Sequence, residues 1–255
     1  MSSSANAREV ARLGITNPGS GTRIDEIADG VYRISTPVPP SDFPGGFTFN
    51  QFLIDDDEAL LFHTGLRQLF PLVREAIATV LAPERLRYLA FSHVEADECG
   101  SLNEFLAIAP EAVVLCGAVA AEVSVRDLSD RPPRDLDDAE EVSLGRHTVR
   151  WLYTPHTPHA WECGYLYELT TRTLFCGDLF TQPGHEHVPI TETDILESSE
   201  AMRAQMDYYS HSPETGALIE KLAATEPTTL ACMHGASFRG DGGHQLRKLR
   251  RALNA

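Results

Sequence analysis

Ser92-His93-Val94-Glu95-Ala96-Asp97-Glu98-Cys99-Gly100 is the stretch that decides how this sequence is interpreted. It follows the apolar run 86–91, which is typical of a buried strand, and it precedes a predicted helix. In an extended backbone, residues two apart point the same way, so His93, Glu95 and Asp97 could present an imidazole and two carboxylates to one metal ion. An isolated His-x-Glu-x-Asp triplet is more often a polar loop with a helix-capping acid, because such triplets arise by chance. The stretch therefore predicts a metal site only if the rest of the chain supplies further ligands.

Three more segments each place a metal-ligating residue type directly after an apolar run. The first contains His156 and His159, either of which could join the metal, the second ends in Asp178, and the third ends in His234. Taken singly, each has an ordinary explanation: a solvated or helix-capping acid, or a satisfied structural histidine. Strand ends that lead into loops are where ligand sites gather in α/β folds. Because four such segments occur together, we predict that they converge on one metal site.

The order of apolar runs predicts a mixed chain of strands and helices. Short runs broken by turns between residues 24 and 62 predict antiparallel strands, and helical spacing from Gln68 to Pro83 predicts the first helix. Helices and strands then alternate, which indicates crossover connections. No shift in composition divides residues 23–255, so one domain is expected there. The other expected elements are a flexible N-terminal arm over 1–22, loops over 126–141 and 180–193, and helices near 198–210, 215–224 and 243–253.

Together these motifs resemble the metallo-β-lactamase superfamily, whose common signature is His-x-His-x-Asp-His. This chain has His93-x-Glu95-x-Asp97-Glu98, and Glu in place of the middle His is similar to flavodiiron proteins and their oxygen-binding diiron relatives. The resemblance covers most of the chain from Arg23 onward, including the family's opening strands. It implies an α/β, metallo-β-lactamase-like four-layer αββα sandwich over residues 23–255.

The same resemblance implies a centre of two metal ions. Nitrogen and oxygen ligands without thiolate suit iron first, and manganese and zinc are also compatible. The resemblance places His93, Glu95 and His159 on one metal and Asp97 and His234 on the other, with Asp178 bridging the two.

Two positions in this ligand set need a choice. His159 is preferred to His156 because the relatives place this histidine about one β-hairpin before the Asp, and 178 − 159 = 19 whereas 178 − 156 = 22. Glu98 departs from the signature, which has His there. The second metal is therefore either held less strongly or gains another carboxylate.

Four further histidines are candidates to line the site. His156 would then contact a ligand or line the pocket. The loop that contains His185 and His187 could lean over the open coordination positions as a proton donor or substrate contact, although its ordinary explanation is a flexible polar loop. In the relatives an acid commonly stands at the position of His63, so His63 either touches the site from outside or packs at a strand end.

Composition excludes several classes of partner. The chain has 21 Lys and Arg against 37 Asp and Glu, a net charge of −16, which would repel a nucleic-acid backbone. No stretch approaches the ~18 apolar residues of a membrane span, and the N-terminus lacks the apolar core of a signal peptide, so a cytoplasmic protein without membrane contacts is expected. The five cysteines lie apart without a Cys-x-x-Cys motif and are expected to be reduced thiols.

The leading functional hypothesis is a diiron protein that binds or reduces a small diatomic ligand, dioxygen or nitric oxide. Its electrons would come from an external donor, because no side chain here supplies them. Flavodiiron proteins have a flavodoxin domain after the diiron domain, whereas this chain stops soon after His234, so no FMN is expected within it. The alternative is a hydrolase in which a metal-bridging hydroxide attacks an ester, lactone, thioester or phosphoester.

Two further expectations concern a role without metal chemistry and the oligomeric state. A binding or scaffold protein without metal chemistry is disfavoured, because the ligand-type residues are retained almost completely. The family resemblance is also compatible with a homodimer.

Overall fold

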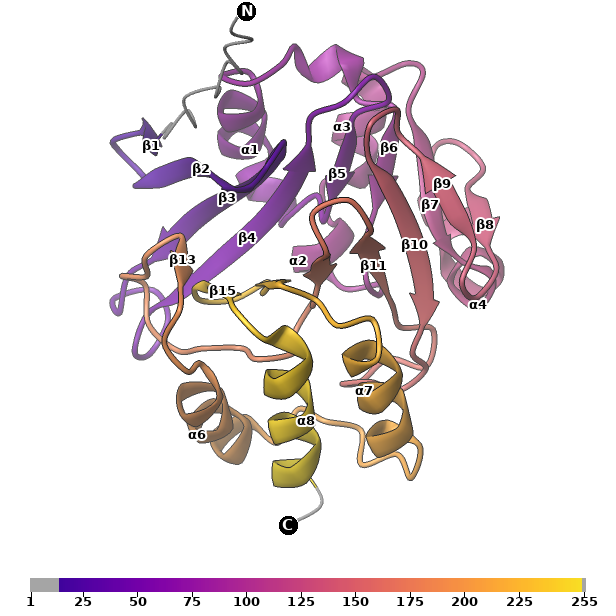
Figure 1. Ribbon diagram of the computed structural model, residues 1–255. Helices are drawn as coiled ribbons and strands as arrows, with labels where there is room; N and C mark the ends of the chain where they lie inside the picture. The colour runs from indigo at the N-terminus through magenta and orange to yellow at the C-terminus, as the bar shows by residue number, and fades with distance from the viewer. Residues whose placement is uncertain (1–13, 254–255) are drawn as a thin grey trace, which may run out of the picture.

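Two β-sheets form the centre of the molecule, which is seen in a computed structural model that describes residues 14–253 (Figure 1). The first sheet contains, in spatial order, β1 (Gly14–Asn17), β2 (Thr22–Ala28), β3 (Val31–Val38), β4 (Phe47–Ile54), β5 (Leu60–Phe62), β6 (Tyr88–Ala90), β7 (Val113–Gly117) and β8 (Arg134–Leu136). The second contains β13 (Ile190–Thr191), β15 (Ser237–Arg239), β14 (Thr229–Ala231), β12 (Thr173–Phe175), β11 (Gly164–Glu168), β10 (Thr148–Tyr153) and β9 (Glu141–Ser143). Strands β1 to β5 are antiparallel neighbours and β5 to β8 are parallel, whereas β12 and β14 form a parallel pair within the second sheet.

Helices cover the outer face of each sheet (Figure 1). On the first sheet, Val73 and Phe105 from two helices pack into the same apolar core as Leu89 of β6. On the second, Ile219 and Leu246 pack with the strands in the same way. The helices are α1 (Phe70–Ile77), α2 (Ala96–Cys99), α3 (Leu102–Ile108), α4 (Ala118–Ala120), α5 (Arg126–Leu128), α6 (Leu196–Met206), α7 (Thr215–Ala223) and α8 (Gly242–Leu253), with short non-α turns at Arg67–Leu69, Pro83–Arg85 and Ala121–Val125.

The apolar interior has three layers, because side chains along each strand point alternately to its two faces. Successive side chains of a strand point to opposite faces, so Leu61 packs under the helices of the first sheet while Phe62 points between the sheets. Leu174 and Phe175 divide in the same way on the second sheet. Each large apolar side chain that is fully buried contributes about 1.5–3 kcal/mol. Three apolar layers between two sheets and two sets of helices make a four-layer αββα sandwich, which confirms the predicted fold class.

The structure differs from the sequence-based expectations in three segments. Residues 14–22 of the expected arm include β1, which pairs with β2; residues 1–13 lie outside the described part of the chain. The expected loop 126–141 contains α5 and β8, and the expected loop 180–193 contains β13. These strands are short and polar, and backbone hydrogen bonds to a neighbouring strand hold them, so apolar alternation gives no sign of them.

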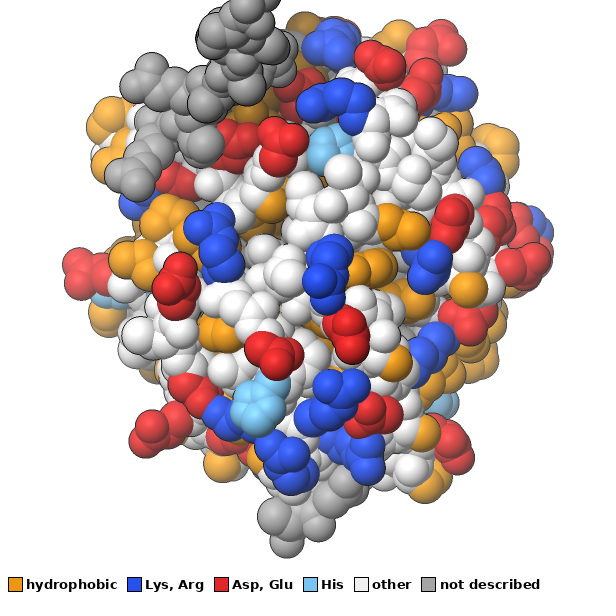
Figure 2. Space-filling view, viewed as in Figure 1, with side chains coloured by type: hydrophobic (Ala, Val, Ile, Leu, Met, Phe, Trp, Pro, Cys, Tyr) orange, Lys and Arg blue, Asp and Glu red, His pale blue; other side chains and the backbone are white. Residues whose placement is uncertain are grey.

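The surface and the cysteines agree with the composition. On the face seen in Figure 2, Lys and Arg side chains alternate with Asp and Glu, without a broad basic area among the described residues. Within residues 14–253, no helix combines the length and apolarity needed to cross a membrane. All five cysteines lie in this part of the chain and are free thiols, as predicted.

Candidate metal centre

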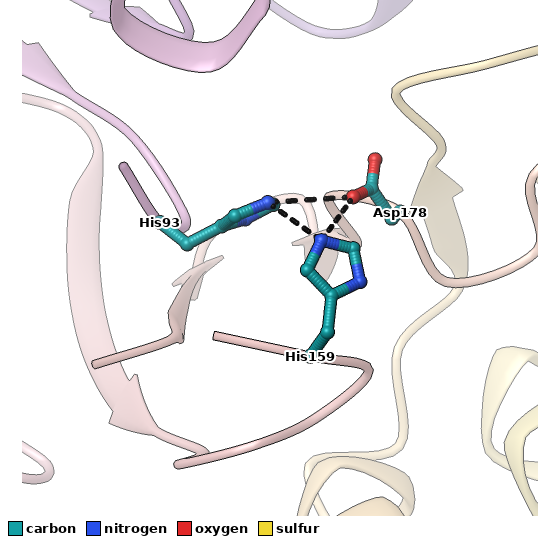
Figure 3. Close-up of side chains that lie close together, drawn as sticks. All are labelled: His93, His159 and Asp178. Atoms are coloured by element: carbon teal, nitrogen blue, oxygen red, sulfur yellow. Dashed lines mark hydrogen bonds and ion pairs between the residues drawn. The ribbon is translucent and has the colours of Figure 1, made fainter. Parts of the chain in front are cut away.

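The six expected ligands lie at one end of the paired sheets. His93 follows β6, Asp178 follows β12, and His234 follows β14. Strands β12 and β14 are parallel, so their carboxyl ends meet at the same edge of the second sheet. His159 lies in the loop between β10 and β11, which opens toward the same end. Figure 3 shows His93, His159 and Asp178 pointing toward one another.

One half of the centre is formed around two imidazoles. The Nε2 atoms of His93 and His159 are 3.1 Å apart, and Asp178 Oδ2 lies 3.5 Å from the first and 3.4 Å from the second (Figure 3). Glu95 Oε1 lies 3.1 Å from His159 Nε2 and 3.6 Å from His93 Nε2. Four ligand-type side chains therefore converge, as expected from the sequence for one metal.

The other half is formed around His234. Its Nε2 atom lies 3.2 Å from Asp178 Oδ1 and 3.5 Å from Asp97 Oδ2. The two carboxylate oxygens of Asp178 thus face different sets of ligand-type residues, Oδ2 toward His93 and Oδ1 toward His234. This is the placement that a bridging carboxylate requires.

The backbone that presents the first ligands is extended only in part. Glu95 is extended, with φ −134° and ψ 166°, but α2 begins at Ala96. The expectation of a fully extended His-x-Glu-x-Asp stretch is therefore wrong at Asp97. The helical turn brings the neighbouring Glu98 inward as well, where it is 0% exposed and clusters with His93 and Glu95 on one side and with Asp97 and His234 on the other. The position of Glu98 in the signature, where His is usual, is the feature of the sequence that indicates its role.

Glycines beside two ligands allow the close packing of the loops. Gly177 has φ +48°, and a Cβ there would lie 2.9 Å from Ser92 Oγ. Gly235 has φ +96°, and a Cβ there would lie 2.5 Å from the Gln182 side chain. Both conformations are ones that glycine adopts without strain. Substitution at either position would displace the adjacent ligand.

The contacts between acids and imidazoles shift their pKa values. Hydrogen bonds from His159 and His93 lower the pKa of Glu95 to about 2. Burial alone would lower the pKa of His234, but contacts with Asp178 and Asp97 raise it to about 10. Burial and the neighbouring Asp178 raise the pKa of Glu98 well above its ordinary value. The cluster is therefore an acidic environment that favours bound positive charge.

Hydrogen bonds outside the cluster orient two of its imidazoles. His234 Nδ1 lies 2.7 Å from the Thr48 carbonyl oxygen, to which it can only donate, so loss of a proton from this ring would free Nε2, the nitrogen that faces the site. His93 Nδ1 lies 2.9 Å from Ser92 Oγ, which lies 3.0 Å from His63 Nε2. Burial lowers the pKa of His63 to about 3, so this ring is neutral. His63 is thus a buried strand-end residue that also touches the site through Ser92.

An apolar cavity of about 310 Å³ opens over the cluster. The Phe47 ring stacks on His234, with ring centroids 4.2 Å apart. The hydroxyls of Thr181 and Tyr208 line the cavity, and both donate to the Asp178 carbonyl oxygen. The other apolar residues that line it are Phe43, Phe49, Leu66, Met202 and Met206.

The three histidines proposed as proton donors lie elsewhere. The structure brings His159, and not His156, against His93, and the His156 side chain is exposed. His185 and His187 line a separate cavity of about 620 Å³, together with Arg23. The expectation that their loop leans over the metals is therefore wrong.

Comparison with protein families gives a match over most of the chain. The family model described as "ODP family beta lactamase" matches residues 47–235, a range that includes all six expected ligands. The chain is 29% identical to the rubredoxin-oxygen oxidoreductase of Megalodesulfovibrio gigas over 214 residues, which is 77% of this chain and 50% of that protein. It is 26% identical to the nitric oxide reductase of Moorella thermoacetica over 212 residues, 78% of this chain and 51% of that protein. The chain thus spans about half the length of these relatives.

Solved structures match the fold. The rubredoxin oxygen:oxidoreductase of Desulfovibrio gigas has a TM-score of 0.75 at 21% identity, over 89% of this chain and 61% of that chain. The Flv1 flavodiiron core of Synechocystis has a TM-score of 0.76 at 22% identity, over 91% of this chain and 60% of that chain. At these identities the likeness establishes the fold.

Proposed function

Because this chain belongs to the family described as ODP family beta lactamase, within the metallo-β-lactamase superfamily, we propose that it holds two iron ions and binds or reduces a small diatomic molecule such as dioxygen or nitric oxide. The match to this family and to flavodiiron relatives confirms the resemblance inferred from Glu95 in the signature. The observation that carries the proposal is Asp178, whose two oxygens face two separate sets of ligand-type residues.

The donor set supports iron at this position. His93, Glu95 and His159, with one oxygen of Asp178, would hold one ion; Asp97 and His234, with the other oxygen, would hold the second. Asp178 Oδ1 is buried and makes no hydrogen bond, its contact with His234 Nε2 being an ion pair, and such an atom is costly to bury unless a ligand satisfies it. Imidazole and carboxylate ligands without thiolate favour iron or manganese. Two bound irons would supply the one-electron chemistry that protein side chains lack.

The cavity supports a small uncharged molecule over a hydrolase substrate. An ester, lactone or phosphoester needs polar groups that hold its oxygens. Here the hydroxyls of Thr181 and Tyr208 are already engaged with the Asp178 carbonyl oxygen, and the remaining lining beyond the metal-facing residues is apolar. Dioxygen and nitric oxide are weak hydrogen-bond acceptors and enter such a cavity without losing strong hydration.

The surrounding residues have positioning roles in this proposal. Thr48 and Ser92 hold His234 and His93 in the orientation that leaves Nε2 free for metal. Phe47 covers His234 and excludes water from that side. Reduction would require an external electron donor, because no side chain of the site is a source of electrons.

Anaerobic loading with Fe(II) tests the proposal. The full chain is expected to retain two irons, to change its visible absorption when nitric oxide is added, and to consume dioxygen or nitric oxide when a chemical reductant is present. Protein stripped by a chelator is the control and should do none of these. Retention of zinc alone, with hydrolysis of test esters and no response to either gas, would instead establish the hydrolase alternative.

A further inference from the structure

Glu98 is a carboxylate buried without a hydrogen-bond partner. Its side chain is 0% exposed, and neither Oε1 nor Oε2 makes a hydrogen bond. The backbone at Glu98 is anchored, because its carbonyl oxygen accepts a hydrogen bond of 2.7 Å from the Thr64 backbone N–H. An unpaired buried carboxylate destabilises a fold strongly, so its retention here requires a cation or a proton.

The position of Glu98 favours a cation. Its Oε1 lies 3.9 Å from His93 Nε2. It forms one possible metal-holding group with His93 and Glu95 and another with Asp97 and His234, so it faces both halves of the centre. Within the described residues, no other side chain apart from Asp178 faces both halves in this way.

The total charge of the acids in the centre also favours a cation beside Glu98. The acids Glu95, Asp97, Glu98 and Asp178 carry four negative charges when ionised, which equals the charge of two divalent cations. With His in place of Glu98, as in the superfamily signature, the sum would be three. The additional carboxylate favours hard cations and stabilises a more highly charged oxidation state.

We propose that Glu98 is a seventh protein ligand, which faces both metals and makes the centre with two divalent ions electrically neutral. This inference rests on the proposed two-metal function. It assigns to this chain a donor set of three imidazoles and four carboxylates, richer in carboxylate than the signature that it resembles.

Glu98→Gln and Glu98→His test the inference, with Glu104→Gln as the matched control. Gln keeps the shape of the side chain and removes its charge. Glu104 lies on α3, and its carboxylate pairs with exposed Arg67 instead of with a proposed ligand. E98Q is expected to bind at least one iron about tenfold more weakly, or worse, in chelator competition, because loss of a residue even outside the direct ligands commonly costs that much. E104Q should match the wild type.

Thermal melting with and without metal shows whether Glu98 is a metal ligand or a purely structural residue. Without metal, E98Q should melt at a higher temperature than the wild type, because it removes a carboxyl group that is costly to bury either ionised or protonated; with iron, this advantage should shrink or reverse. A purely structural Glu98 would lower the melting temperature in both states. Should E98Q not fold, E98H answers the question: it should retain two irons with an altered absorption spectrum and a more positive reduction potential.

The outcomes distinguish this inference from the proposed function. If the wild type holds fewer than two metals, the two-metal function fails. If the wild type holds two, and the folded variants keep the same affinities, spectrum and potential, only the role of Glu98 is overturned.

Discussion

The two ends of the β10–β11 hairpin both place a histidine against a carboxylate, and they differ in how the carboxylates are paired. At one end, His147 Nδ1 lies 3.2 Å from Glu168 Oε1, and both residues are buried. Glu168 also accepts hydrogen bonds from the backbone N–H groups of Thr170 and Thr171, at 2.8 and 2.7 Å. This carboxylate has its full set of partners and needs no further ligand.

At the other end, the loop of the same hairpin presents His159 to Glu95 and Asp178. Here Asp178 Oδ1 and both oxygens of Glu98 are buried without a hydrogen bond. The residue types are the same at the two ends, and His147, Glu168, Asp178 and Glu98 are all buried. The pairing of the carboxylates therefore distinguishes the two ends, because Glu168 accepts backbone hydrogen bonds whereas the Glu98 oxygens accept none.

Asp178→Ala should give the largest effect at the metal end. The change removes the carboxylate that faces both halves, so both irons should be lost and reactivity with dioxygen or nitric oxide should fall at least 100-fold. Metal analysis of the purified chain measures the first effect, and gas consumption measures the second. A variant that still held two irons would show that the bridging role is misassigned.

A matched pair of histidine variants tests the choice made within one loop. His159→Ala removes a side chain that lies 3.1 Å from both His93 and Glu95 and should cost at least one iron. His156→Ala alters an exposed side chain of the same loop and should leave the iron content within error of the wild type. Equal effects of the two changes, measured by metal analysis, would argue against the geometry.

Ser92→Ala should have a smaller effect on the same half. It removes the hydroxyl between His93 and His63 while leaving every proposed ligand in place. Iron affinity should fall about tenfold, as is common for residues that orient a metal-binding histidine. Chelator competition measures this change, and Ser92→Thr, which keeps the hydroxyl, should restore most of the affinity.

Glu168→Gln should change stability and leave iron content unchanged. The hydrogen bond with Glu168 raises the pKa of His147. Burial alone would raise the pKa of Glu168, but hydrogen bonds from His147 and Thr171 lower it to about 2. The Glu168 contribution is present above its ordinary pKa of 4.5 and is lost as the pH falls toward 2. The His147 contribution is present below 6.5 and is lost as the pH rises through its raised pKa.

The difference in unfolding free energy between wild type and E168Q should therefore be greatest between pH 4.5 and 6.5, at about 3 kcal/mol. Urea unfolding across this pH range measures it. A difference that does not vary with pH would show that the ion pair contributes little.

Much of the fold and of the site could be predicted from local features of the sequence. Alternating apolar residues predict strands because a pleated strand presents successive side chains to opposite layers, and the three observed cores follow this rule. Ligand types placed directly after apolar runs, such as Asp178 and His234, predict a shared site because strand ends meet at one edge of a sheet. Apolar alternation does not predict short strands such as β1 and β8, which pair with a neighbouring strand through the backbone.

Contacts between segments far apart in the sequence decided the direction of the loops and of Glu98. The loop with His185 lies away from the metals because Gly184 N–H donates to the carbonyl oxygen of Gly46, 138 positions earlier in the chain (184 − 46 = 138). Glu98 points inward because α2 begins at Ala96 and Thr64 holds its end, which a pattern of residue types does not reveal. The sequence by itself determined the layers and the ligand types, because these depend on neighbours along the chain. Only the tertiary structure decided which side chains share the site, because loop direction depends on partners far away in sequence.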